Sequence, residues 1–530
     1  MMNIDRSNNS FLKRRTVIIY LLSICIVGFV IRLYFQPQVP LTGDATNYFV
    51  YAADTALNGR ITDTYFLANS GWSLILSGLF STTGLDNPVS LMQSQRLLSI
   101  IISVVTVIPL YFLCRKFFNH YYSIIGVSLF IFEPHLVVNS TLGITEPIFL
   151  FFGISTITLF LSKSKTSTYI SFVSLGLFSI VRYEGLILFV TLSVLYFIKY
   201  RHSKRNFFGY PLILIMFMLT IIPVAYVNFE MHERDGFVSE IIASGGYSYN
   251  VILQGEVDEG DPIYGEKSDS SVKNFIMTST NNSILMMGLL SFPILFAFVF
   301  IGIFFILKNK IFFRINFQVL TIILVSATMF IPTLYAYGRG IEDVRFLFTL
   351  FPIIILISLY GISQIRVKKN QIMLVGIMSI ILIASITYMD LKKIDNNYEG
   401  EVFYITKFIN ERTNIINDDS ADLRYRTSSG IIVDWPVLPD AVEDSHIIRN
   451  LDLFSAAGYE SLNEFLNVGK QEGLEYIIVD GRDAQPEFLR DIYDNEKKYS
   501  NLKKIFDSND LGFKYHVKIF KINFEVQNEN

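Results

Sequence analysis

Several charged residues fall where long apolar runs end, and their types suit proton removal and phosphate binding. Asp44 lies in the segment Leu-Thr-Gly-Asp-Ala-Thr-Asn-Tyr at 41–48, where Gly43 permits a sharp turn and the aspartate can cap a following helix. A carboxylate that accepts backbone N–H groups stays ionised at neutral pH, so Asp44 can act as a base toward a hydroxyl. The alternative is that Asp44 is only a helix cap.

Two arginines offer the complementary chemistry, the binding of a phosphate group. Arg182 and Glu184 lie between two short apolar runs, and Arg345 opens a later run that contains Pro352. A guanidinium group holds phosphate oxygens through paired N–H donors. The alternatives are an Arg182–Glu184 salt bridge without a substrate, and an Arg345 side chain that reaches toward lipid headgroups.

Glu146 and His135 are further candidates for a site. Glu146 follows Thr145 and precedes Pro147, a pattern typical of the first turn of a helix, where the helix dipole favours a carboxylate. It can hold a hydroxyl, a cation or an arginine, or it can serve only as a cap. His135 has no evident His or Cys companion, so we expect an interfacial residue and no metal site. Acids alone can hold Mg²⁺ or Mn²⁺, which leaves a divalent cation open.

The composition indicates that these residues are held by a membrane-spanning scaffold. Of the 530 residues, 51% are hydrophobic and only 17% are charged, which is too apolar for an ordinary soluble chain of this length. The net charge of −3 argues against a nucleic-acid-binding protein, which needs a basic surface. Cys25 and Cys114 both fall inside apolar runs, so they indicate neither a disulfide framework nor a zinc site.

The apolar runs predict a polytopic α-helical membrane protein with about eleven transmembrane helices. Some runs are shorter than the roughly 20 residues that a span needs, and 169–181 is among the shortest. The runs lie at 16–35, 90–114, 121–138, 146–161, 169–181, 185–197, 210–227, 284–307, 317–334, 346–365 and 371–388.

The distribution of basic residues predicts the orientation. The clusters at 115–116, 163–165, 199–205, 308–314 and 366–369 all fall on the side of the N-terminus, which the positive-inside rule makes cytoplasmic. The candidate site residues then lie on the opposite side. We expect a transmembrane domain at 1–389, with a first outer loop at 36–89 and a large outer loop at 228–283.

The polar segment 390–530 is expected to form a small extracytoplasmic α/β domain. Its pattern predicts helices at 401–412 and 487–506, and strands at 476–480 and 514–524.

The order of these motifs along the chain resembles the GT-C superfamily of membrane glycosyltransferases. Within it, the closest likeness is to the protein mannosyltransferase and aminoarabinose transferase group, and it covers essentially the whole chain. Each motif by itself is weak evidence for the superfamily, and the whole set in this order is more specific evidence. The motifs are Arg32, Gly43-Asp44, Tyr48, Ala52, Asn58-Gly59, Gly71-Trp72, Arg96, Thr145-Glu146-Pro147, Arg182-Tyr-Glu-Gly, Arg345-Phe-Leu and Pro352.

The resemblance implies an inverting transferase that uses a polyprenyl- or dolichyl-phosphate sugar. The sequence itself requires no cofactor, and a divalent cation is an alternative that it leaves open. Asp44 would be the catalytic base, removing a proton from an acceptor hydroxyl of a protein, lipid or glycan on the extracytoplasmic side. Arg182 and Arg345 would hold the donor phosphate. The residues that would support them or the acceptor are Glu146, Glu184, Tyr48 and Arg96.

The sequence departs from the family in one respect and leaves other readings open. Many relatives have two adjacent acids in the first outer loop, whereas Ala45 follows Asp44 here, so the role of a second acid falls away or passes to Glu146. The Trp-Trp-Asp signature of oligosaccharyltransferases is absent, which argues against transfer of a whole oligosaccharide.

The alternatives to a transferase are a transporter or a lipid-linked-sugar flippase without catalysis and, less favoured, a sensor. We expect a cell membrane protein of a prokaryote.

Overall fold

The protein is represented by a computed structural model whose described residues form two compact units. The first unit comprises 1–36, 61–75 and 95–393, and the second comprises 37–60, 76–94 and 394–530. The domain boundary at 389–390 stays a prediction. The described residues are 14–37, 41, 43–61, 66–83, 88–203, 208–249, 272–309, 316–365, 370–392, 400–401, 404–405, 408, 459, 461–471, 474, 476–480 and 487–525.

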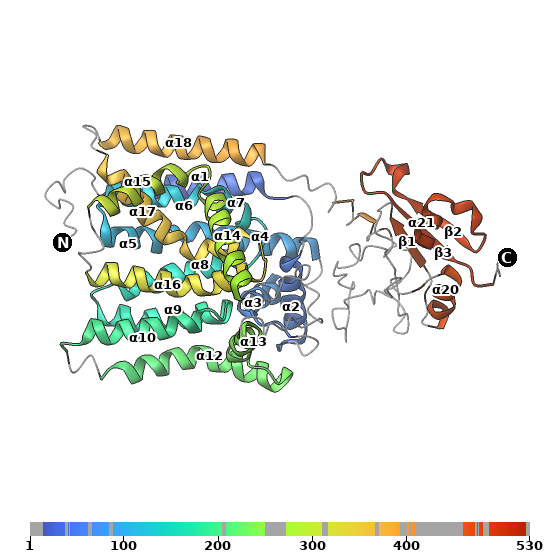
Figure 1. Ribbon diagram of the computed structural model, residues 1–530, viewed down its shortest axis with the longest axis horizontal. Helices are drawn as coiled ribbons and strands as arrows, with labels where there is room; N and C mark the ends of the chain where they lie inside the picture. Colours follow the sequence, from blue (N-terminus) through green and yellow to red (C-terminus); the bar gives the residue numbers. More distant parts are fainter. Residues whose placement is uncertain are drawn as a thin grey trace. The chain divides into compact units, whose positions relative to one another are not determined.

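The first unit is a bundle of apolar helices, most of which run side by side (Figure 1). By length and composition, six helices in the described part can span a membrane, or eight if each of two bent helix pairs counts as one span. Three shorter helices, α8, α9 and α10, are also apolar. The protein is therefore an integral, multi-pass membrane protein, and the number of eleven spans stays a prediction.

The helices of the bundle are, in chain order, α1 (Arg14–Phe35), α4 (Pro88–Val105), α5 (Val107–Phe117), α6 (His120–Ile131), α7 (Pro134–Ser140), α8 (Glu146–Phe160), α9 (Lys165–Val181), α10 (Gly185–Tyr200), α12 (Tyr210–His232), α13 (Val238–Tyr249), α14 (Val272–Ser291), α15 (Leu295–Lys308), α16 (Phe317–Gly338), the 3-10 helix η4 (Val344–Leu350), α17 (Phe351–Gln364) and α18 (Asn370–Leu391). The first residues of α3 (Gly71–Thr83) also belong to this unit, and the first residues of α4 belong to the second.

Two runs that were predicted as single spans are each broken into two helices. The run 121–138 divides into α6 and α7, which bend by 55°, and the run 284–307 lies in α14 and α15, which bend by 114°. Pro134 begins α7, and Pro293 precedes α15. Proline lacks the N–H that would continue a helix and disfavours helical backbone at the residue before it. Hydropathy records composition and not direction, so it did not predict the two bends, and the crossing of the membrane by each pair as one span stays a prediction.

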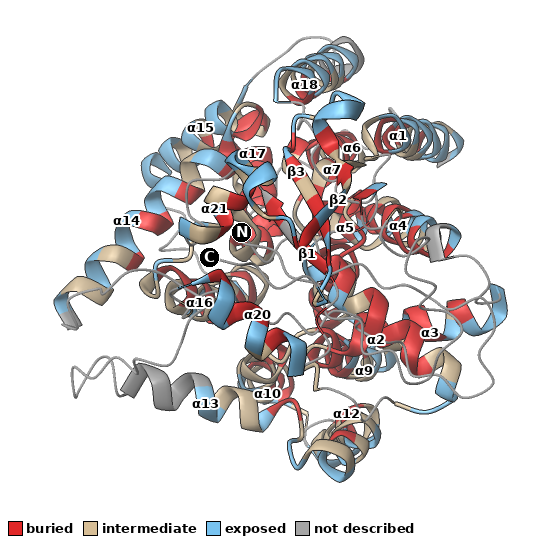
Figure 2. Ribbon diagram, turned by 90° about the vertical axis from the view of Figure 1, so that its right-hand side faces the viewer, coloured by how far each residue is buried: buried red, intermediate tan, exposed pale blue. Residues whose placement is uncertain are grey.

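Many large apolar side chains of the bundle are exposed. Figure 2 shows that exposed residues follow one another along α15 and α18. Ile26, Leu219, Phe304 and Ile380 are 63%, 69%, 59% and 64% exposed. Such side chains are stable when they face lipid.

Inside the bundle, two glycines bring α15 and α17 into close contact. A Cβ atom added to Gly302 would lie 2.1 Å from the carbonyl oxygen of Ile357, and one added to Gly361 would lie 2.6 Å from the backbone nitrogen of Gly302. Small residues allow helix backbones to approach in this way within a membrane.

Arg32 is a structural residue of the bundle. Its side chain is fully buried. Nε donates to Ser140 Oγ at 3.0 Å, Nη1 to the carbonyl oxygens of Gly28 and Ile131 at 3.0 and 2.9 Å, and Nη2 to Ser103 Oγ at 3.1 Å. The sequence offers Arg32 only as one motif of the GT-C resemblance, whereas these hydrogen bonds fasten α1 to α4, α6 and α7.

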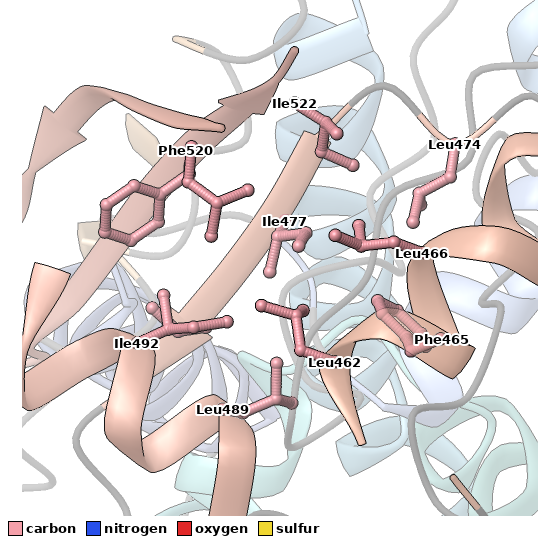
Figure 3. Close-up of a cluster of buried hydrophobic side chains, with 11 residues drawn as sticks. Leu462, Phe465, Leu466, Leu474, Ile477, Leu489, Ile492, Phe520 and Ile522 are labelled. Carbon is pink, nitrogen blue, oxygen red and sulfur yellow. The ribbon is translucent and has the colours of Figure 1, made fainter. Parts of the chain in front are cut away.

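The second unit contains α2 (Asp44–Asn58), most of α3, and a small C-terminal sheet with its helices. Strands β1 (Tyr476–Asp480), β2 (Leu502–Asp507) and β3 (Val517–Ile522) form an antiparallel sheet in the order β1-β3-β2. Side chains of α20 (Leu462–Gln471) and α21 (Glu487–Asp494) pack with Ile477 and Phe520 of the sheet in one apolar cluster (Figure 3). Short 3-10 helices, η6 (Glu496–Lys498) and η7 (Ser508–Leu511), flank β2.

The strand predictions at 476–480 and 514–524 are confirmed by β1 and β3. The predicted helix at 487–506 is correct for α21 and wrong for 502–506, which lies in strand β2. Lys503 and Lys504 hide its strand pattern, and β2 lies at the edge of the sheet, where lysines are common because they discourage pairing with other chains. Within the predicted helix at 401–412, residues 401, 404, 405 and 408 are helical, and the others lie outside the described residues.

Polar contacts brace α21 against the turn that follows it. Asp491 accepts hydrogen bonds from Lys498 Nζ at 2.6 Å, from Tyr499 Oη, and from Asn495 Nδ2 at 2.7 Å. These hydrogen bonds lower the pKa of Asp491 to about 2.

Candidate active site

The start of α8 places Glu146 inside the bundle. Thr145 is the N-cap of α8, Glu146 is its first residue and Pro147 its second, so the predicted first-turn acid is confirmed. Glu146 is only 4% exposed, whereas a simple surface cap would be solvated. A buried carboxylate is costly unless cationic groups compensate for its lost hydration.

Arg182 is held in the connection between α9 and α10. Its Nη2 atom lies 2.7 Å from Glu184 Oε1, and its Nε donates to the same oxygen at 3.1 Å. The guanidinium carbon also lies 5.2 Å and 5.8 Å from the ring centroids of Phe149 and Phe346. The salt bridge that the sequence offered as an alternative is therefore present, and two aromatic rings restrict the orientation of the arginine further.

Arg345 is held in a similar way at the start of η4. Asp343 is the N-cap of this 3-10 helix and accepts the backbone N–H of Arg345 at 2.8 Å. The same carboxylate accepts Arg345 Nε at 2.6 Å. The carbonyl oxygen of Asp343 in turn accepts a hydrogen bond from Tyr337 Oη at 3.0 Å, which anchors this turn to α16.

The two arginines meet at Glu146. Arg182 Nη1 lies 3.9 Å and Arg345 Nη1 lies 3.7 Å from Glu146 Oε1. Each arginine thus uses its Nε for the carboxylate of its own turn and directs Nη1 toward the shared acid. We call Glu146, Arg182, Glu184, Asp343 and Arg345 the arginine–carboxylate cluster. It brings together three connections that are far apart in the sequence.

The charge and exposure of the cluster limit what it can bind. The side chain of Glu146 is 5% exposed, that of Arg182 is 17% exposed and that of Arg345 is 32% exposed. An anion would therefore reach the cluster most easily from the Arg345 side. The five formal charges leave one negative charge in excess, so an additional anion must compete with Glu146 for the Nη1 groups.

Asp44 and Tyr48 belong to α2 in the second unit. Gly43 is the N-cap of α2, with a φ of 55°, and Asp44 is the first helical residue. The expectation that Asp44 itself caps α2 was therefore wrong by one residue, because glycine adopts a positive φ without strain. Asp44 is exposed and Tyr48 is half-buried. The role of Asp44 as the catalytic base stays a prediction.

The remaining candidates lie in the bundle. Arg96, on α4, is only 4% exposed, and its supporting role stays a prediction. His135 Nδ1 lies 2.8 Å from Oε1 of Glu133, the N-cap of α7, which is 1% exposed. Within the described ranges, no group of three or more His, Cys, Asp or Glu side chains is arranged to hold a metal ion.

Sequence reasoning missed the aromatic platforms of Arg182. Phe149 lies three residues after Glu146 on α8, and Phe346 directly follows Arg345. The helical spacing of Phe149 from Glu146 could have indicated a shared face. The contact of Phe346 with Arg182 depends on the packing of distant segments, and no local signal reveals it.

Solved structures of membrane proteins show the same fold. The oligosaccharyltransferase of Archaeoglobus fulgidus in the apo form is 12% identical, with a TM-score of 0.58 over 98% of this chain and 76% of that chain. The same enzyme with an inhibitory peptide and a dolichol-phosphate is 13% identical, with a TM-score of 0.51 over 87% and 69%. ArnT from Cupriavidus metallidurans bound to undecaprenyl phosphate is 10% identical, with a TM-score of 0.53 over 96% and 98%. The sequence itself matches no protein-family model and no curated protein.

Proposed function

Because the chain has the fold of the GT-C membrane glycosyltransferases, we propose that it transfers a sugar from a polyprenyl- or dolichyl-phosphate carrier to an acceptor hydroxyl with inversion of configuration. The acceptor is a protein, a lipid or a glycan on the extracytoplasmic side, and the protein lies in the cell membrane of a prokaryote. The archaeal neighbour binds dolichol-phosphate and ArnT binds undecaprenyl phosphate, which supports a lipid-phosphate donor.

The observation that carries the proposal is the convergence of Arg182 Nη1 and Arg345 Nη1 on Glu146, at 3.9 and 3.7 Å. Two guanidinium groups with fixed orientations can stabilise the charge that develops on a departing phosphate without reorganising during the reaction. Glu184 and Asp343 hold the two arginines in place. The donor phosphate would take over part of the interaction that Glu146 makes in the resting protein.

The excess negative charge of the cluster has a role in this scheme. A sugar-linked carrier is a phosphodiester with one negative charge. The released lipid phosphate is a monoester and carries about 1.5 to 2 negative charges at neutral pH. Glu146, Glu184 and Asp343 therefore repel the product more strongly than the donor. This difference favours release of the spent carrier after transfer.

The reaction is a single displacement. Asp44 accepts the proton of the acceptor hydroxyl while the hydroxyl oxygen forms a bond to the anomeric carbon. The bond between the anomeric carbon and the phosphate oxygen breaks, and its electron pair leaves with the lipid phosphate. A phosphate leaving group needs no protonation, so one carboxylate suffices, unlike the acid–base pair of glycoside hydrolases.

The test is release of lipid phosphate by the full-length protein in lipid nanodiscs. The donors are undecaprenyl phosphates linked to mannose or to aminoarabinose, and turnover is measured with and without a membrane extract as the source of acceptor. We expect Asp44→Asn to abolish release and Arg182→Ala to reduce it by about 10²-fold or more. Asp390→Asn and Arg490→Ala, which change exposed residues of α18 and α21, are the matched controls.

The outcomes separate this proposal from its alternative. A flippase or transporter moves the sugar-linked lipid across the bilayer without releasing lipid phosphate. If neither donor is consumed and the labelled lipid changes leaflet, the transport function is favoured. If Asp44→Asn turns over at the rate of Asp390→Asn, Asp44 is not the base.

A further inference from the structure

We propose that Asn69, Gly71 and Trp72, together with Gln95, form a clamp that positions Glu146 and Arg182 relative to each other. All four residues belong to the first unit. They lie outside the arginine–carboxylate cluster and contact the two turns from which Glu146 and Arg182 project. The consequence for phosphate binding rests on the proposed function, whereas the consequence for the geometry of the turns does not.

One side of the clamp holds the turn that carries Arg182. The backbone N–H of Tyr183 donates to Asn69 Oδ1 at 3.3 Å. A Cβ atom added to Gly71 would lie 2.7 Å from the carbonyl carbon and 2.8 Å from the carbonyl oxygen of Ile180. The backbone at 71 therefore packs directly against the last turn of α9, and a side chain there would push the two segments apart.

The other side of the clamp holds the turn that leads into α8. Trp72 Nε1 donates to the carbonyl oxygen of Gly143 at 2.9 Å, and Gln95 Nε2 donates to the same oxygen at 2.7 Å. Trp72 and Gln95 are both fully buried. Gly143 has a φ of 83°, which favours glycine, and it lies three residues before Glu146. Two buried donors on one carbonyl oxygen fix the direction of this turn.

The clamp acts through backbone geometry. Its hydrogen bonds end on the backbone of Tyr183 and Gly143, so they add no charge to the cluster. Because residues 69 and 72 are close in the chain, they tie together two turns that lie about 40 residues apart in the sequence. The distance between Glu146 and Arg182 depends on how far apart these two turns are held in space. A displacement of about 1 Å can cost about 10²-fold in rate at a site of this kind.

Hydrogen exchange tests the clamp without any assumption about function. In the full-length protein, Asn69→Ala removes the acceptor of the Tyr183 amide, and we expect exchange in peptides covering 181–185 to accelerate about five- to tenfold. The matched control is Thr158→Val, which removes the hydrogen bond from Thr158 Oγ1 to the carbonyl oxygen of Pro109 at 3.0 Å, near the opposite end of α8. Unchanged exchange in Asn69→Ala, or equal acceleration in the control, would overturn the proposal.

A double-mutant cycle tests whether the clamp acts through Arg182. The probe is undecaprenyl phosphate, and its dissociation constant is measured by thermal stabilisation of the detergent-solubilised protein. Trp72→Phe and Gln95→Leu each replace one donor to the carbonyl oxygen of Gly143 by an apolar side chain. We expect the combined variant to bind the lipid at least tenfold more weakly, and the same pair of changes to have less than a twofold effect when Arg182→Ala is already present.

The two experiments distinguish a failure of the clamp from a failure of the proposed function. If the unaltered protein binds neither undecaprenyl phosphate nor dolichyl phosphate while Asn69→Ala still loosens the Tyr183 amide, the proposed function is wrong and the clamp stands. If the lipid binds and the clamp changes weaken it equally with and without Arg182, they act by general destabilisation, and the positioning role is refuted. Thermal midpoints without lipid, measured for every variant, show how much folding each change costs.

Discussion

Replacement of Glu146 by glutamine tests the central contact of the site. The carboxylate is 5% exposed and lies 3.9 and 3.7 Å from Arg182 Nη1 and Arg345 Nη1. At an effective dielectric constant of about 20, each such pair attracts by about 4 kcal/mol. Part of this attraction offsets the cost of burying the acid, and the Arg345 pair is weakened because that side chain is 32% exposed. We therefore expect Glu146→Gln to destabilise the folded protein by about 3 kcal/mol.

The same change should strengthen the binding of lipid phosphate. Without the Glu146 charge, the two guanidinium groups lack their shared anion, and a phosphate no longer competes with a carboxylate. We expect undecaprenyl phosphate to bind Glu146→Gln at least tenfold more tightly, which adds about 1.4 kcal/mol of stabilisation at saturating lipid. Turnover should nevertheless fall, because the product is retained and the arginines are less well oriented.

The assay is the thermal midpoint of the solubilised protein at increasing concentrations of undecaprenyl phosphate. Glu230→Gln, which neutralises an exposed acid of α12, is the control. The expected result is a lower midpoint for Glu146→Gln without lipid and a larger lipid-induced rise than in the unaltered protein. If the lipid raises the thermal midpoint equally in Glu146→Gln and in the unaltered protein, the reasoning is refuted, since the phosphate would then bind away from Glu146.

Three further predictions follow from the scaffold. Arg32→Met should lower the thermal midpoint, by a loss of about 3 kcal/mol for its buried hydrogen bonds, while activity per folded molecule persists. Gly302→Leu should reduce the yield of folded protein, because Gly302 packs against the α17 backbone, whereas Gly376→Leu, with no atom within 4 Å of the added Cβ, should be tolerated. The pKa of Asp491 lies below that of an unfolded aspartate, so its contribution to the stability of the C-terminal sheet is present above about pH 4 and lost as the pH falls toward 2. Asp491→Asn should flatten this pH dependence, as measured by hydrogen exchange in the sheet.

The sequence alone was sufficient to identify the membrane class and the local setting of the site residues. Apolar runs long enough to span a bilayer predict helices, because backbone groups in lipid must be satisfied within the helix. The Thr-Glu-Pro pattern predicted Glu146 in the first turn of α8, and the break in hydropathy around Arg182 predicted a connection between two helices. These features depend on residues within one or two turns of each other, so local physical rules determine them.

Only the tertiary structure decided which of these residues meet. Hydropathy did not reveal the 114° bend between α14 and α15, nor that Arg32 turns into the bundle while Arg182 and Arg345 turn toward Glu146. The clamp on Gly143 was equally hidden, because neither a tryptophan nor a glutamine in an apolar segment indicates its partner. Such contacts arise when helices pack at particular angles and their turns approach, and that packing is set by side chains spread over the whole chain.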